Sequence, residues 1–335
     1  MDNKLMKFGK NLVFSLVIPV VVYVVLKILC MTIGDPGFAV GSDLATIIYT
    51  AIYTSMISMA MSFNLFSGRF DFSVGATLAL STILGGNIAK NNNMNAAGLF
   101  ITIICIGMIL GLISGLVYVT MKLPPMITSL GLAMIYESIT LIYNNSQGVR
   151  LIGKVKVLVF ASQPYLWILL LSVMAICIYI FRFTKFGYHH QALASGQKIS
   201  LDIGIKEKRN ALFCYVLAGA LLGVAGCIYL SKYGTVSPEA GLSSGSYFMG
   251  AFLPLFIGGF IGKYSNTIIG IVIGAFTSAM ISSGLVRLGL GTSMQTVING
   301  LLVMGFLIFT SNSYKFEIRK MEKEKLAKAI RSEQI

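Results

Sequence analysis

The sequence predicts an all-α integral membrane protein, a polytopic helical bundle of about ten transmembrane helices with roughly eight to ten as the range. Hydrophobic residues make up 56% of the 335 residues and charged residues only 11%, and the mean hydropathy is +0.82. Soluble domains carry roughly 25% charged residues. Apolar runs of about 20 residues, long enough to cross a bilayer, follow one another along the chain and leave no room for a large soluble domain.

The first apolar run, from Asn11 to about Ile33, follows three lysines within the first ten residues. It is too long for the core of a cleaved signal peptide, so we expect it to remain as the first crossing. Lys27, near its far end, is expected to extend its ammonium group to the outer surface. Further crossings are predicted at 43–64, 70–90, 97–121, 124–143, 165–183, 211–231, 246–261, 266–284 and 294–311.

The predicted crossing at 246–261 is the weakest of these. It is short, contains Pro254, and ends with Gly258 and Gly259. We therefore expect a broken or re-entrant element there, since backbone of this kind is tolerated at membrane depth where protein covers it.

The distribution of positive charge predicts the orientation. Ten crossings put both termini on one side, which then carries 19 Lys and Arg against six on the other side. Because Lys and Arg accumulate in cytosolic loops, we expect a cytosolic N-terminus (1–10), a membrane domain (11–311) and a cytosolic tail (312–335) in a cell membrane. The outer loop 144–164, with three positive residues, runs against this trend. The net charge of +14 is then a mark of topology and not of nucleic-acid binding.

Glycines spaced four residues apart predict close helix packing. Lipid offers no hydrophobic drive between helices, so small residues on one face let backbones approach closely. The sets are Gly107, Gly111 and Gly115, then Gly219 and Gly223, then Gly270 and Gly274.

Two acids lie within or at the edge of predicted crossings, Asp71 and Glu137. Acids near the bilayer centre tend to face a cavity or a partner. Glu137 either lines a pathway or makes a structural hydrogen bond, and Asp71 is expected chiefly to cap the helix that starts beside it. With Thr128 and Ser129, these two residues are the candidates for lining a pathway.

The sequence offers no catalytic chemistry. The run GGFIGKYSN from Gly258 lacks the glycine and the Ser or Thr that a phosphate-binding loop requires. The two histidines, His189 and His190, are adjacent in a polar loop, and the five cysteines lie in apolar runs without metal-type spacing. We expect no enzyme activity, no metal and no cofactor on this chain.

The segment 182–210 is the only long polar interval between two apolar runs. It carries six Lys and Arg against two acids. A solvated loop held in the cytosol by its charge is one interpretation, and a docking segment for a soluble partner is the other.

Three motifs, in order, resemble the permease subunits of ribose-type ABC importers. The first is SGRFDFSVGATLAL from Ser67, the second is GLISGLVYVTMKLPPMITSLGLAMIY from Gly111, and the third is TKFGYHHQALASGQKISLDIGIKEKRN from Thr184, continuing into the glycine-containing run after it. The resemblance covers roughly residues 45–310. The stretch GSYFMGAFLPLFIGGFIGKYSN departs from the family pattern, which indicates a divergent member.

The resemblance implies a translocation pathway for a small polar solute, and we expect a monosaccharide such as ribose or a related sugar. Separate cytosolic ATP-binding subunits would power the transport. It also implies an extracytoplasmic solute-binding protein and a second permease copy, identical or not, within lipid. A short cytosolic helix at about 192–203 would dock into the ATPase. The coupling residues would be Ala192, Ala194, Ser195, Gly196, Gln197, Ile199, Leu201, Ile203 and Gly204.

Three alternatives stay open at this point. Related scaffolds carry nucleosides or branched-chain amino acids. An ion-coupled secondary carrier would use Asp71 and Glu137, although such carriers are expected to show more intramembrane ionisable groups. A membrane anchor without transport is the third.

Overall fold

The computed structural model describes residues 2–35, 37–262, 266–309 and 312. The predicted tail at 312–335 lies outside the described residues apart from Asn312, and the division into a cytosolic N-terminus, a membrane domain and a tail stays a prediction. The larger helices are α1 (Asp2–Thr32), α2 (Ser42–Leu65), α3 (Val74–Asn91), α4 (Ala96–Met121), α5 (Pro125–Ile142), α6 (Tyr165–Phe183), α9 (Glu207–Tyr233), α11 (Phe252–Gly262) and α12 (Thr267–Arg287), with a last one at Thr292–Phe309.

Shorter elements connect these helices. They are η1 (Tyr143–Ser146), α7 (Lys185–Ser195), α8 (Gln197–Asp202), η2 (Ser243–Gly245), α10 (Ser246–Met249) and the strands β1 (Val149–Arg150) and β2 (Thr235–Val236). The two strands pair antiparallel, with Val149 opposite Val236.

The predicted all-α membrane fold is confirmed. A helix lies at each of the ten predicted positions, and eight segments among the described residues are long and apolar enough to cross a membrane. The apolar part of α1, Leu16–Thr32, is shorter. Helix α3 falls outside the eight, but 14 of its 18 residues are buried. A helix enclosed by other helices does not need an apolar surface toward lipid.

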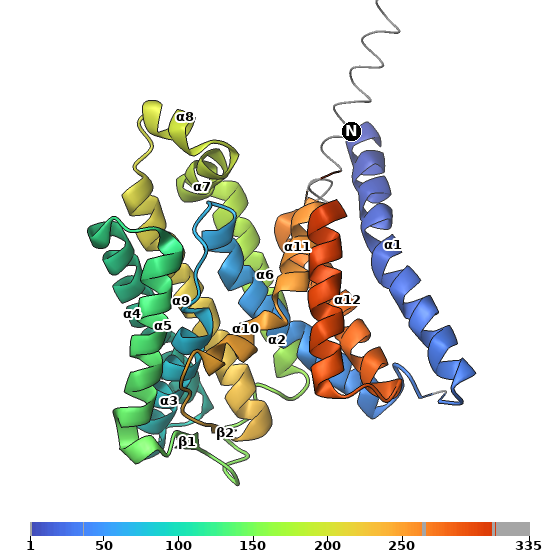
Figure 1. The fold of residues 1–335 in the computed structure, drawn as a ribbon, viewed down its shortest axis with the longest axis horizontal. Coiled ribbons are helices and arrows are strands. Elements are labelled where there is room, and N and C mark those ends of the chain that lie inside the picture. The colour runs from blue at the N-terminus through green and yellow to red at the C-terminus, as the bar shows by residue number, and fades with distance from the viewer. Residues whose placement is uncertain (1, 36, 263–265, 310–311, 313–335) are drawn as a thin grey trace, which may run out of the picture.

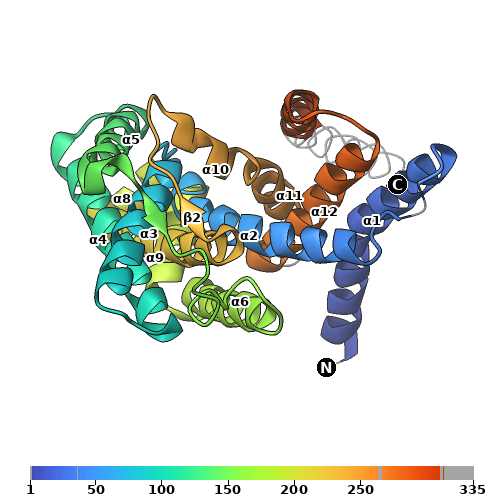
Figure 2. The same ribbon diagram turned by 90° about the horizontal axis from the view of Figure 1, so that it is seen from below.

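The helices form a bundle that α2 runs through. Helices α3, α4, α5 and α9 gather on one side of it, and α11, α12 and α1 on the other (Figures 1 and 2). Helix α2 packs against both α9 and α12, and α1 packs against α12. The short helices α7 and α8 lie at the end of the bundle where α1 begins, and β1 and β2 lie at the opposite end (Figure 1).

The prediction of a broken element at 246–261 is confirmed, although the break lies earlier than Pro254 and the glycines after it suggested. The chain turns through η2 and α10 and then restarts as α11 at Phe252. The Ser58 hydroxyl of α2 donates to the Ala251 carbonyl at 2.8 Å, so a backbone group at the break has a partner in place of water. Gly258 lies inside α11, where a Cβ would meet Ile271 of α12 at 2.5 Å.

The predicted glycine faces are confirmed as helix contacts. A Cβ on Gly107 of α4 would lie 2.3 Å from the Gly219 carbonyl oxygen of α9, and a Cβ on Gly219 would lie 2.1 Å from the Gly107 oxygen. A Cβ on Gly274 of α12 would lie 2.7 Å from the Pro254 oxygen of α11. Only glycine allows these backbones to approach so closely.

We predict that Gly219→Ala lowers the thermal midpoint of the detergent-solubilised protein, with a cost of about 1–3 kcal/mol, because the new methyl group meets backbone that has to shift. Gly131→Ala is the matched control, since Gly131 lies on the exposed side of α5 with nothing within 4 Å of its Cβ position. Its midpoint should be unchanged or slightly higher. Equal midpoints for the two variants would show that the α4–α9 contact is looser than described.

Candidate functional site

The polar segment 182–210 forms two helices and not one. The helix expected at about 192–203 is divided at Gly196, where α7 ends at Ser195 and α8 begins at Gln197. The Gly196 backbone is extended (φ 177°), and a Cβ there would touch only the tip of Ile199, at 3.7 Å. The chain therefore bends between the two helices, with free space around Gly196.

Apolar side chains stand exposed on α8 and just after it. Ile199 and Ile203 are each 70% exposed and Leu201 is 46% exposed. Ala194, Ser195, Gln197 and Gly204 are also exposed, while Ala192 is half-buried. Clustered exposed apolar residues rimmed by polar ones mark interaction sites. Lys198, Lys206 and Lys208 form part of that rim.

Helix α7 is fastened to α2 by His190. The His190 side chain is 2% exposed, and its Nε2–H donates to the Phe63 carbonyl oxygen at 2.8 Å. The imidazole ring lies 5.0 Å from the Phe181 ring, edge to face, and the Phe181 ring stacks on Phe63 at 4.7 Å. Burial lowers the pKa of His190 to about 4, so the ring is neutral at physiological pH and packs uncharged among its aromatic neighbours.

Arg69 lies beside this joint and is the largest fully buried side chain among the described residues. Its Nη2 donates to the Cys214 sulfur at 3.2 Å, and its Nη1 lies 4.0 Å from a Glu207 carboxylate oxygen. Arg69 lies in the loop between α2 and α3, and its guanidinium reaches the first part of α9. It thereby joins the same region that His190 fastens.

Glu137 of α5 holds the turn that precedes α10. Its side chain is 2% exposed, and its two carboxylate oxygens accept the Leu242 N–H at 2.7 Å and the Ser244 N–H at 3.0 Å. Thr140, one turn further along α5, accepts the Glu239 N–H at 3.1 Å. Of the two interpretations left open for Glu137, the structural hydrogen bond therefore has direct geometric support, and the pathway-lining role stays a prediction.

The other predicted pathway residues make local contacts. The Asp71 carboxylate accepts the Ser73 N–H at 2.8 Å just ahead of α3. The Thr128 hydroxyl donates to the Pro125 carbonyl, and the Ser129 hydroxyl donates to the Met126 carbonyl. Among the described residues, the structure does not join Asp71, Thr128, Ser129 and Glu137 into one hydrogen-bonded group.

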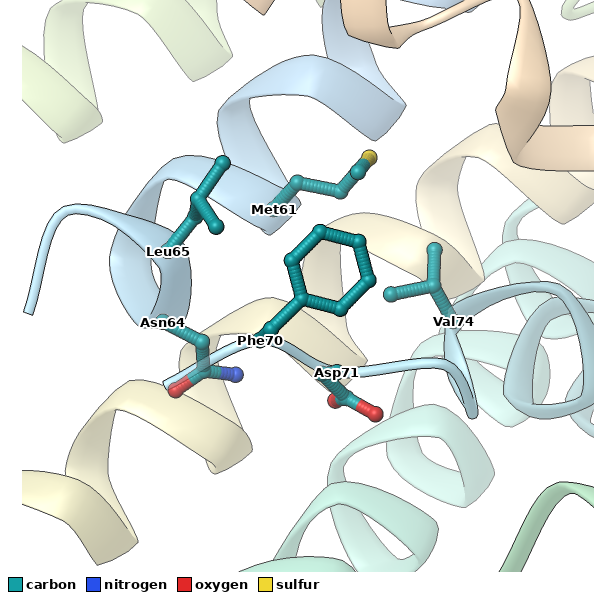
Figure 3. A pocket seen from close by; sticks show the side chains of 6 residues that line it. All are labelled: Met61, Asn64, Leu65, Phe70, Asp71 and Val74. Atoms are coloured by element: carbon teal, nitrogen blue, oxygen red, sulfur yellow. The ribbon is translucent and has the colours of Figure 1, made fainter. Parts of the chain in front are cut away.

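A small cavity lies beside Asp71, where α2 ends and α3 begins. Its volume is about 10 Å³, room for about one water molecule and far below the several hundred Å³ of small-molecule sites. Figure 3 shows the Phe70 ring between Met61 and Val74, with the Asn64 and Asp71 side chains below it. In this conformation the region beside Asp71 is closed to a solute.

A third membrane-edge acid was missing from the sequence prediction, which counted only Asp71 and Glu137. Asp43, in the first turn of α2, is 9% exposed and accepts hydrogen bonds from the Ala39 N–H and the Ser283 hydroxyl. Arg287 lies 3.5 Å from it and pairs with Asp35 at 2.8 Å. These groups line an open cavity of about 600 Å³ between α2 and α12. The ion pairs attach the turn between α1 and α2 to the end of α12.

Comparison with known proteins adds family relationships. A family profile described as "Branched-chain amino acid transport system / permease component" matches residues 43–309. The ribose import permease protein RbsC of Bacillus subtilis (strain 168) is 26% identical over 297 residues, which is 83% of this chain and 87% of that protein. The autoinducer 2 import system permease protein LsrC of Yersinia pseudotuberculosis serotype O:1b (strain IP 31758) is 23% identical over 292 residues, 84% of this chain and 82% of that protein. No solved structure matches at comparable significance.

We predict that His190 makes the stability of the protein pH-dependent. The pKa of His190 is about 4 in the folded protein and 6.5 in its unperturbed state, so between these values the unfolded chain binds the proton. The stability that the neutral His190 contributes is fully present above pH 6.5 and is lost as the pH falls toward 4. At pH 5 the loss amounts to about 2 kcal/mol. The thermal midpoint measured from pH 7.5 to pH 5 should fall less steeply in His190→Gln than in wild type. His189→Gln, at the exposed neighbouring position, should keep the wild-type slope, and identical slopes in all three proteins would contradict the assignment.

A second prediction concerns Glu137. Glu137→Gln replaces one acceptor with an amide NH₂ group facing a backbone N–H, which should cost about 1–3 kcal/mol of stability. Ser138→Ala, on the exposed side of the same helix, should be nearly neutral. The thermal midpoints of both variants decide the point, and a wild-type midpoint for Glu137→Gln would mean that the carboxylate does not hold the turn.

Proposed function

Because the chain belongs to the family of branched-chain amino acid transport system permease components, we propose that it forms the membrane pathway through which an ABC importer carries a monosaccharide. The family consists of transport permeases, and the chain is a multi-pass membrane protein. The single observation that carries the solute class is the match to a ribose import permease over 87% of that relative's length. Ribose or a related sugar is the solute we favour.

The exposed apolar group on α8 supports a docking site for the ATP-binding subunit. Ile199, Leu201 and Ile203 are presented to solvent at one end of the bundle, where a groove on a partner would bury them. The small residues Ala192, Ala194, Ser195 and Gly196 allow a close approach, and Gln197 and Gly204 flank the anchors. This coupling segment (192–204) would receive the motion that follows ATP binding.

The same arrangement supports the proposed orientation of the molecule in the membrane. If α7 and α8 face the cytosol, then the start of α1 does as well, and the loops that carry β1 and β2 face outward (Figure 1). An extracytoplasmic solute-binding protein would dock on that outer end. A second permease copy, identical or related, would complete the pathway.

The joint at His190 supplies a route for the motion. A shift of the coupling segment pulls α7, and the His190 bond to Phe63 together with the stacked phenylalanine rings passes that shift to α2. Helix α2 contacts both halves of the bundle. Movement of one packed helix against its neighbours is the shear type of transition that switches access between two states.

The docking proposal predicts that Ile199→Glu releases the ATP-binding subunit. A charge at the centre of an apolar contact should weaken binding by at least about tenfold, so the subunit should fail to copurify in mild detergent and ATP-driven uptake should be lost. Val155→Glu is the matched control, because Val155 is 76% exposed and follows β1, which lies at the opposite end of the bundle (Figure 1). This variant should retain the subunit. Copurification at the wild-type level with Ile199→Glu would overturn the docking site.

Uptake itself tests the proposed function. Proteoliposomes that contain the permease, its ATP-binding subunit and its solute-binding protein should accumulate a labelled pentose or hexose only when ATP is present, and an ionophore should have no effect. Uptake that collapses with the ionophore and needs no ATP would instead indicate an ion-coupled carrier.

A further inference from the structure

Five tyrosines from three helices form one cluster in the half of the bundle away from α7 and α8. Ring centroids are 6.1 Å apart for Tyr49 and Tyr53, 5.7 Å for Tyr53 and Tyr229, and 5.3 Å for Tyr229 and Tyr247. Tyr233 lies 4.6 Å from Tyr229 and 6.2 Å from Tyr49. We call these five residues the tyrosine cluster. It joins α2, α9 and α10.

Two hydroxyls of the cluster lack a partner. The Tyr49 and Tyr53 hydroxyl oxygens are buried and, among the described residues, make no hydrogen bond, and Tyr49 as a whole is only 5% exposed. Buried tyrosine hydroxyls normally find a partner, since an unpaired one costs about 1–3 kcal/mol. Each such group in a folded protein therefore calls for an explanation.

An interfacial aromatic belt does not supply that explanation. Tyrosines of such a belt place their rings toward the lipid headgroups, whereas Tyr49 packs inside the main core between α2 and α9. The neighbouring residues Tyr233 and Lys232 are exposed at the end of α9, and the Lys232 ammonium lies 5.1 Å from the Tyr49 ring centroid. The cluster thus runs from the surface to the interior.

Acceptor groups are also in place. The Tyr247 hydroxyl donates to a Glu239 carboxylate oxygen at 2.8 Å, and the Ser243 hydroxyl donates to the other oxygen. Glu239 belongs to the turn that Thr140 of α5 holds. The cluster therefore offers ring faces, free hydroxyls and a carboxylate within one region.

The described aromatic residues that meet the start of α11 carry no hydroxyl group. Phe70 lies 4.6 Å from Phe72 and 5.7 Å from Phe252, and Phe252 lies 6.1 Å from Phe256. In α10 the tyrosine contacts and the phenylalanine contacts adjoin, since Tyr247 contacts Tyr229 and the adjacent Phe248 contacts Phe252. In the part of the chain that the structure describes, the ring contacts of α10 on the α9 side thus include tyrosine hydroxyls, whereas those at the start of α11 are between phenylalanines. A purely structural need for aromatic bulk does not explain this difference.

We propose that the tyrosine cluster is a contact site for a neutral, hydroxyl-rich ring, that is, for the monosaccharide on its way through the bundle; this rests on the proposed function. Tyrosine faces pack against the C–H side of a sugar ring, and the Tyr49 and Tyr53 hydroxyls gain partners from its hydroxyl groups. The Glu239 carboxylate would accept a hydrogen bond from a further sugar hydroxyl. Access to Tyr49 and Tyr53 requires α2 to move relative to α9, which couples the site to the conformational change.

The test uses the double variant Tyr49→Phe/Tyr53→Phe, which removes the hydroxyls and keeps the rings. In proteoliposomes with the ATP-binding subunit and saturating solute-binding protein, uptake of labelled D-ribose and of a panel of pentoses and hexoses is measured. We expect about tenfold slower uptake of the sugar that wild type carries, because two hydrogen bonds to it are lost. The thermal midpoint should be unchanged or higher, because two unpaired buried hydroxyls are gone. Tyr179→Phe, at an exposed position on α6, should behave as wild type in both assays.

Each outcome bears on one claim. Wild-type uptake by the double variant overturns the tyrosine site, and slower uptake accompanied by a lower thermal midpoint does so as well, because the hydroxyls would then hold the fold. If wild type carries none of the sugars, the proposed function fails. If wild type carries a sugar and the double variant carries it equally fast, only the site fails.

Discussion

The hydrogen bond from the His190 ring to the Phe63 carbonyl oxygen is the contact on which the functional account depends. It joins residues 127 positions apart in the sequence and ties the polar segment to a helix that passes through the bundle. The stacked Phe181 ring covers it, and the buried Arg69 guanidinium lies in the same region and reaches the start of α9. Phe186 of α7 adds ring contacts to Phe63 of α2 and to Phe213 of α9, with centroids 6.5 Å and 6.1 Å apart.

Helix α2 connects the joint to the remainder of the molecule. Phe63 near its end meets α7, Ser58 partners the broken backbone before α11, and Tyr53 and Tyr49 enter the tyrosine cluster. A displacement of α2 therefore reaches both the break at α10 and the aromatic residues around it. Close glycine contacts hold α4 against α9 and α11 against α12, so we expect each pair to move as a unit.

The sequence predicted the helices well because each crossing is a separate apolar run with polar residues at its ends. It also predicted that the glycine faces, including those with Gly107 and Gly219, are sites of close helix packing, since glycines four apart lie on one helix face. That these two faces meet each other was not evident from the sequence. It did not predict the burial of His190, Arg69 or Asp43. Each of these polar residues lies next to charged or loop residues in the sequence, and its burial comes from helices that are distant in the chain. The split at Gly196 was missed because glycine is also tolerated within short helices at a modest cost.

The tyrosine cluster was likewise invisible at the sequence level. Tyr49 and Tyr53 are four residues apart and predict one helix face, but the other rings come from α9 and α10, about 180 to 200 positions later. Glu137 shows the reverse case, since its location inside a crossing was evident and its partners, the backbone of the turn before α10, were not.

The most direct test of the account is photo-crosslinking from position 201, where an unnatural photoreactive residue replaces the exposed Leu201 in cells that are taking up solute. If α8 docks the ATP-binding subunit, illumination should produce one main adduct, and mass spectrometry should identify an ATP-binding protein in it. An adduct that never contains an ATP-binding protein, obtained while uptake continues, would contradict the account.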